Sequence, residues 1–178
     1  DSEWIAHIKT LGGERKYVEP AKGTVNPRVF IDRLAKKMPA NVTVVADVGQ
    51  NQIWTCTEYK FRKEGRLLTS GGMGTMGYSV PAAIGAKMAD NSRATVAICG
   101  DGAFQMSFME LATAVQFGVD IKVVVMTNNR LGMVRELQTN GYHDRQTAVF
   151  LDGSPDFIKL AEAYGIPCLL YTSDAADE

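Results

Sequence analysis

Short apolar runs alternate with helix-like patterns along most of the chain. Four apolar runs, most of them rich in β-branched residues, predict strands at residues 42–46, 66–69, 94–98 and 121–126. Apolar positions at helical spacing predict helices at residues 26–38, 80–88, 107–117 and 154–164. Strands that alternate with crossover helices are typical of the α/β class, with a parallel sheet flanked by helices on both faces.

Local signals set the expected ends of these helices. Asn26-Pro27 offers an N-cap followed by a proline at the first helical position. Ser107 and Glu110 have the spacing of a capping box, which predicts that a helix begins there. Ser154-Pro155 predicts the start of the last helix, and Gly165 predicts its end.

Each predicted strand is followed by a loop of unusual composition. These loops cover residues 47–52, 70–77, 99–103 and 127–133, and the second contains a string of glycines. The carboxyl ends of parallel strands meet at one edge of a sheet, where ligands of such sheets bind. We therefore expect the four loops to converge on one site.

Composition excludes several classes of protein. The 178 residues include 19 Lys and Arg against 20 Asp and Glu, a net charge of -1, and no basic cluster. A nucleic-acid or membrane partner is therefore not expected. No apolar run approaches the ~20 residues of a membrane span and no signal pattern opens the chain, so we expect a soluble, cytoplasmic protein.

Cysteine usage gives no sign of a disulfide framework or a zinc site. Cys56, Cys99 and Cys168 lie far apart in the sequence, and the chain has two histidines. We expect buried, reduced thiols.

The two ends of the chain differ in composition from the middle. Residues 1–24 are interpreted as a linker or the end of a preceding domain. Residues 168–178 resemble the translation of a sequencing adapter, which predicts a non-native tail; a genuine polar tail is the alternative. On this interpretation residues 25–167 form one domain that is truncated at its C-terminal end.

The motif Gly100-Asp101-Gly102 indicates anion binding through a metal. The glycines let the backbone approach an anion, whereas the aspartate would repel that anion unless a cation lay between them. A diphosphate bridged by Mg²⁺ satisfies both conditions, since Mg²⁺ prefers carboxylate, amide and phosphate oxygens. Asn128 and Asn129, after the next strand, could supply a second oxygen. The alternative for the motif alone is an ordinary tight turn.

An apolar strand, this motif and an asparagine pair together resemble the cofactor motif of thiamine-diphosphate-dependent enzymes. Residues 47–54, 68–78, 80–86 and 131–134 are similar to the large subunit of acetolactate (acetohydroxyacid) synthases. The resemblance covers approximately residues 25–167, which correspond to the C-terminal, thiamine-diphosphate-binding domain of that three-domain family. It implies the thiamine-diphosphate-binding fold.

The resemblance also implies a set of metal ligands. Counting back from Leu131-Gly132 places Asn128 at the family's metal-binding asparagine, 128 − 101 = 27 residues after Asp101. The expected ligands of Mg²⁺ are Asp101, Asn128 and the backbone carbonyl of Arg130. Asn129 is expected to cap the next turn.

The resemblance implies thiamine diphosphate as cofactor, with Gly74 and Met76 at the aminopyrimidine and Met76 holding the bent cofactor. The alternative for Met76 is a role as core filler. The implied cofactor-binding residues are Val48, Gly49, Gln50, Asn51, Gly74, Met76, Gly100, Asp101, Gly102, Ala103, Asn128, Arg130, Gly132 and Met133. The family's catalytic glutamate belongs to its N-terminal domain, so no catalytic residue is expected on this chain.

The implied activity is that of a transferase or lyase of branched-chain amino-acid biosynthesis. Pyruvate would be decarboxylated and its two-carbon unit joined to a second 2-oxo acid. The intact protein would be a homodimer or homotetramer, with a regulatory subunit as a further partner and FAD bound through the family's middle domain. We expect the chain alone to be inactive, because half of each composite site is missing.

One departure from the family pattern concerns the substrate pocket. Leu137 stands where many biosynthetic members carry a tryptophan, which leaves the choice of acceptor open. Another thiamine-diphosphate-dependent decarboxylase or carboligase is therefore an alternative, as is a non-catalytic diphosphate-binding module. A dinucleotide-binding domain is disfavoured, because the glycine string of residues 71–77 is not followed by the acidic residue about 20 positions further on that completes the GxGxxG fingerprint.

Overall fold

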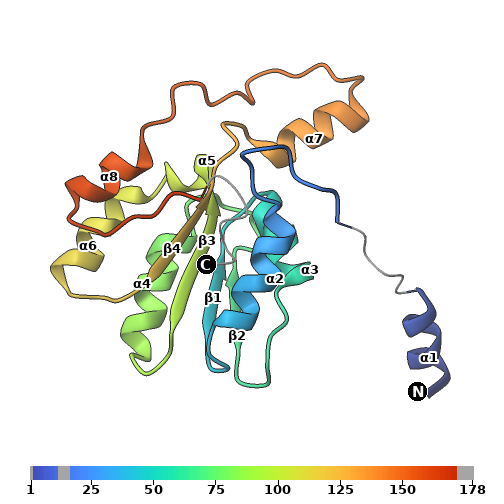
Figure 1. The fold of residues 1–178 in the computed structure, drawn as a ribbon, viewed down its shortest axis with the longest axis horizontal. Helices are drawn as coiled ribbons and strands as arrows, with labels where there is room; N and C mark the ends of the chain where they lie inside the picture. Colours follow the sequence, from blue (N-terminus) through green and yellow to red (C-terminus); the bar gives the residue numbers. More distant parts are fainter. Residues whose placement is uncertain (1, 12–16, 172–178) are drawn as a thin grey trace.

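The computed structural model describes residues 2–11 and 17–171 of the chain, and its centre is a parallel β-sheet (Figure 1). The sheet has the strand order β2-β1-β3-β4. The strands are β1 (Thr43–Ala46), β2 (Arg66–Thr69), β3 (Thr95–Gly100) and β4 (Lys122–Met126). The predicted strands are confirmed, with bounds that differ by two residues at most.

Helices cover both faces of the sheet, as predicted, and Figure 1 shows them to either side of the strands. One face carries α2 (Pro27–Lys37) and α3 (Gln50–Glu58). The other carries α4 (Ser79–Ala89), α6 (Leu111–Gln116) and α8 (Phe157–Ala163).

Alternation along the strands explains this arrangement, because successive strand side chains point to opposite faces. Val44 and Ile98 lie in the apolar cluster that includes Ile31 of α2. Their neighbours Val45 and Ala97 lie in a cluster with a residue of α4. Continuous apolar runs are therefore needed, because each strand is covered on both sides.

The order of the strands creates a switch point between β1 and β3. After β1 the chain crosses through α3 to β2, on one side of β1; it then returns through α4 to β3, on the other side. The loops after β1 and β3 therefore leave the sheet in opposite directions. A crevice outside the carboxyl ends of the strands follows from this topology, and this is where open α/β sheets bind ligands.

Two helices of this edge were not predicted. The helix α3 follows Gly49 directly and has a largely polar sequence, and α7 (Gly132–Gly141) contains no buried residue. Helix α3 has no strong apolar stripe, so hydrophobic spacing alone did not reveal it, whereas Met133, Val134 and Leu137 of α7 do recur at helical spacing and were overlooked. A further short helix, α5 (Asp101–Phe104), begins at the aspartate of the Gly-Asp-Gly motif.

Two predicted helix starts were wrong. The Ser107 hydroxyl is buried without a hydrogen-bond partner, so the expected capping box does not form. A 3₁₀ turn, η1 (Phe108–Glu110), precedes α6 instead. At the last helix, Asp156 rather than Ser154 caps the first turn, accepting hydrogen bonds from the amides of Ile158 and Lys159.

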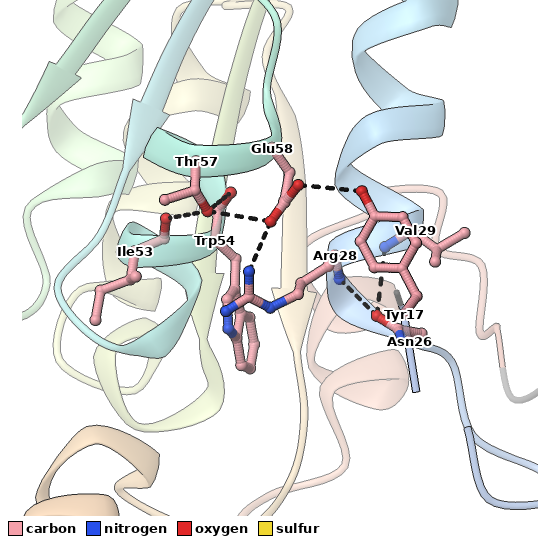
Figure 2. A network of polar contacts seen from close by, with 8 residues as sticks. All are labelled: Tyr17, Asn26, Arg28, Val29, Ile53, Trp54, Thr57 and Glu58. Atoms are coloured by element: carbon pink, nitrogen blue, oxygen red, sulfur yellow. Dashed lines mark hydrogen bonds and ion pairs between the residues drawn. The ribbon is translucent and has the colours of Figure 1, made fainter. Parts of the chain in front are cut away.

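Part of the expected N-terminal linker packs on the domain (Figure 2). The buried Glu58 carboxylate accepts hydrogen bonds from the Tyr17 hydroxyl at 3.1 Å and from Arg28 at 2.6 Å. These contacts join the segment before α2 to the end of α3. The helix α1 (Ser2–Leu11), by contrast, has no buried residue.

Several expectations about the ends lie outside the described residues. Residues 1 and 12–16 of the expected linker and residues 172–178 of the expected non-native tail are among these. Within the described ranges, no helix combines the length and apolar character that crossing a membrane requires.

The expectation of three buried thiols was wrong for two of them. Cys99 is buried, whereas Cys56 and Cys168 are exposed, and all three are free. Cys56 lies on α3, and Cys168 follows α8.

Candidate functional site

A cavity of about 730 Å³ lies at the carboxyl ends of β1, β3 and β4. Residues from all four predicted loops line it, so the expected convergence of these loops is confirmed. Every residue expected to bind the cofactor lies on its wall except Gly74. The volume is in the range of small-molecule and cofactor sites.

Asp101 forms the centre of the site. Its side chain lies at the end of β3, and the residue is only 2% exposed. One carboxylate oxygen accepts hydrogen bonds from the amides of Asn128 at 3.0 Å and Asn129 at 2.6 Å, and the other from Gly102 at 2.8 Å. The carboxylate therefore joins the turn after β3 to the turn after β4.

The two asparagines after β4 lie differently. Asn128 lines the cavity, and its side-chain oxygen accepts the amide of Arg130 at 3.0 Å. Asn129 is not among the lining residues, and its backbone has a left-handed φ of 54°. The turn is thus capped by Asn128, not by Asn129 as expected.

Glycines allow the loops to approach one another at the cavity. A Cβ atom on Gly102 would lie 2.7 Å from a methyl group of Leu131 and 3.3 Å from one of Leu151. A Cβ atom on Gly132 would lie 2.1 Å from the side-chain oxygen of Gln50. A side chain at either position would therefore displace a wall of the cavity.

The N-terminal ends of α3 and α7 both lie at the cavity, through Gln50 and Gly132. Partial positive charge at such ends favours an anion such as a phosphate group. The Gln50 amide also donates a hydrogen bond of 2.9 Å to Glu136 on α7. The two helices are thus connected across the mouth of the site.

Some residues of the site were missed from the sequence. Thr24, Val25 and Phe30, before and within α2, line the cavity together with Trp54 of α3. Nothing in their local sequence indicates a ligand, and only the packing of α2 beside α3 brings them there. Asp47 was also missed, although it directly follows β1 and is fully buried.

Two residues expected near the ligand lie away from the cavity. Gly74 does not line it and has a φ of 65°, which glycine adopts without strain. Leu137 on α7 is 60% exposed and does not line it either. A role for Leu137 would therefore need other parts of a larger protein to cover α7.

Cys99 is fully buried near Asp47 and Asp101, and its thiol is unreactive. Burial strongly raises the pKa of its thiol, and the charge of Asp47 raises that pKa further. The thiol therefore stays protonated and unreactive at neutral pH.

The described residues contain no cluster of three or more His, Cys, Asp or Glu side chains that could hold a metal. A cation at this edge would therefore be bound by Asp101 together with amide, carbonyl or phosphate oxygens. Such oxygen-rich sets suit Mg²⁺ and do not suit a structural zinc ion.

Comparison with known proteins identifies the family to which the chain belongs. Residues 47–178 match the family described as thiamine pyrophosphate enzyme, C-terminal TPP binding domain. The acetolactate synthase large subunit of Lactococcus lactis is 43% identical over 166 residues, which are 93% of this chain and 29% of that protein. The acetolactate synthase isozyme 3 large subunit of Escherichia coli is 40% identical over 141 residues, which are 79% of this chain and 25% of that protein.

The chain thus spans less than a third of the length of these relatives. Its matched region contains the buried Asp101 and the residues that line the cavity, except those of and before α2. On this evidence the chain belongs to the thiamine pyrophosphate enzymes and carries their C-terminal TPP-binding domain.

Proposed function

We propose that this chain is the cofactor-binding part of an acetolactate synthase that depends on thiamine diphosphate (thiamine pyrophosphate) and Mg²⁺. The observation that carries the proposal is the cavity in which buried Asp101 faces the turn of Asn128. Similarity to acetolactate synthase large subunits over most of the chain supports this choice among thiamine pyrophosphate enzymes.

Asp101, Asn128 and the carbonyl of Arg130 would hold the metal and, through it, the diphosphate. The residues present fit this role, because the buried carboxylate of Asp101 and the side-chain oxygen of Asn128 follow adjacent strands and both residues line the cavity. The N-terminal ends of α3 and α7 would add a favourable potential for the diphosphate.

The other walls would hold the organic part of the cofactor. Met76 lines the cavity, and its terminal methyl group lies 3.4 Å from the position of a Cβ on Gly102. When bound, the cofactor supplies the electron sink for decarboxylation of a 2-oxo acid. The task of this chain is to bind, orient and desolvate it.

The finer parts of the activity belong to an intact subunit. We propose pyruvate as donor, a second 2-oxo acid as acceptor, and branched-chain amino-acid biosynthesis as the setting. Homodimers or homotetramers, a regulatory subunit and an FAD-binding middle domain are part of the same proposal. The chain alone is expected to form no acetolactate, because no catalytic residue is proposed on it.

A second candidate is another decarboxylase or carboligase of the same cofactor class. The observation that favours it is Leu137, which presents an exposed leucine at a position where many biosynthetic synthases carry a tryptophan. The cofactor loops do not discriminate between these activities.

Two measurements test the proposal. Calorimetric titration of the intact protein should show that thiamine diphosphate binds in the presence of Mg²⁺ and that chelation by EDTA abolishes binding. Incubation with pyruvate should then yield acetolactate. Binding without acetolactate, but with release of CO₂ or another ligation product, would favour the second candidate; absence of Mg²⁺-dependent binding would refute both.

A further inference from the structure

Asp47 holds a loop of the site although it does not line the cavity. It follows β1 directly and is fully buried. One carboxylate oxygen accepts the amides of Val48 at 2.8 Å and Gly77 at 3.0 Å, and the other accepts the amide of Ser79 at 2.8 Å. Two of these three donors lie about thirty residues further along the chain, in the loop before α4 and at its first residue.

A carboxylate buried in this way is stable only because its oxygens accept hydrogen bonds. Burial of an unpaired charge is costly, and hydrogen bonds from backbone amides to a carboxylate are among the stronger ones in proteins. The contact therefore specifies where the loop lies, because no other position of its amides would satisfy Asp47.

The fixed amides of Gly77 and Ser79 directly follow the point at which a side chain enters the cavity. Gly77 directly follows Met76, which lines the cavity. Gly77 has a φ of 85°, and a Cβ on it would lie 2.9 Å from the Cβ of Met106. The loop is thus held between Asp47 on one side and Met106 on the other, which leaves Met76 little freedom.

We infer that Asp47 is a positioning residue, which holds Met76 against the thiamine part of the cofactor. This inference rests on the proposed function. The diphosphate end has an independent anchor in Asp101, whose carboxylate joins the turns after β3 and β4. The two buried aspartates therefore anchor different loops of one cavity.

Replacement of Asp47 by its neutral isostere asparagine should weaken binding of the thiamine part of the cofactor and not of the diphosphate. In Asp47→Asn one side-chain oxygen can still accept two amides, but the new NH₂ group then faces the amide of Ser79. Two donors that face each other cannot bond, so the loop should shift while the turn of Asp101 stays in place.

The experiment measures two dissociation constants on the intact protein, one for thiamine diphosphate and one for inorganic diphosphate, both with saturating Mg²⁺. Asp47→Asn should raise the first by about ten-fold or more and leave the second unchanged. The control is Asp156→Asn, which alters a carboxylate that also accepts two backbone amides but caps α8 away from the cavity. It should change neither constant.

Equal weakening of both ligands by Asp47→Asn would overturn the inference, because it would indicate general loss of structure. Unchanged binding of both ligands would overturn it as well. If that variant does not fold, Gly77→Ala perturbs the same loop from the side of Met106 and should give the same selective loss. Failure of the unaltered protein to bind thiamine diphosphate would instead overturn the proposed function.

Discussion

Substitution of each asparagine after β4 tests which one serves the metal. Asn128→Ala removes the side-chain oxygen that accepts the amide of Arg130 at 3.0 Å, a loss of about 1 kcal/mol of folding stability. Asn129→Ala places alanine at a φ of 54°, which costs roughly 1 kcal/mol. The two variants should therefore be destabilised to a similar extent.

The two variants should differ in their affinity for the cofactor. If Asn128 provides a metal oxygen, Asn128→Ala should raise the dissociation constant for thiamine diphosphate with Mg²⁺ by about 100-fold or more. Asn129→Ala should raise this dissociation constant by less than about ten-fold, since its only effect on the site is a backbone strain of ~1 kcal/mol. Asn129→Gly relieves that strain and should bind like the unaltered protein.

The assay is calorimetric titration of the intact protein with thiamine diphosphate at saturating Mg²⁺. Urea unfolding of the same variants measures their stability and shows that loss of binding is not loss of fold. The reasoning would be refuted by the reverse order, with Asn129→Ala and not Asn128→Ala abolishing binding. That result would place the metal ligand one residue further along the chain.

Three further predictions concern the loops and side chains around the site. Gly77→Ala should destabilise folding by roughly 1–3 kcal/mol more than Gly118→Ala in urea unfolding, because both residues have positive φ but only Gly77 meets a close neighbour; equal losses would contradict this. Iodoacetamide at pH 8 should label Cys56 and spare Cys99 in mass spectrometry, because burial raises the pKa of the Cys99 thiol; rapid labelling of Cys99 would show that the site opens. Leu137→Trp in the intact enzyme should raise the preference for 2-oxobutyrate over pyruvate by about ten-fold in a competition assay, whereas an unchanged ratio would place Leu137 outside the acceptor pocket.

The sequence by itself determined the fold class, because apolar strands and crossover helices can be packed in few other ways. Val44 and Val45 are both buried, each on its own face of the sheet, and the local run of apolar residues already requires this. Asp101 and the pair Asn128-Asn129 could also be singled out, since each follows a strand and the ends of parallel strands meet at one edge, but the choice of Asn128 within the pair came from the family resemblance.

The tertiary structure decided what depends on neighbours that are remote in the sequence. The order of the strands puts the loops after β1 and β3 side by side, and only this reveals the crevice between them. The roles of Asp47 and Ser107 illustrate the limit of local signals. Asp47 accepts amides from a segment about thirty residues away, and the Ser107 hydroxyl makes no cap hydrogen bond despite its capping-box spacing. A hydrogen bond or cap forms only where packing brings its partner close, and the spacing of residues along the chain does not contain that information.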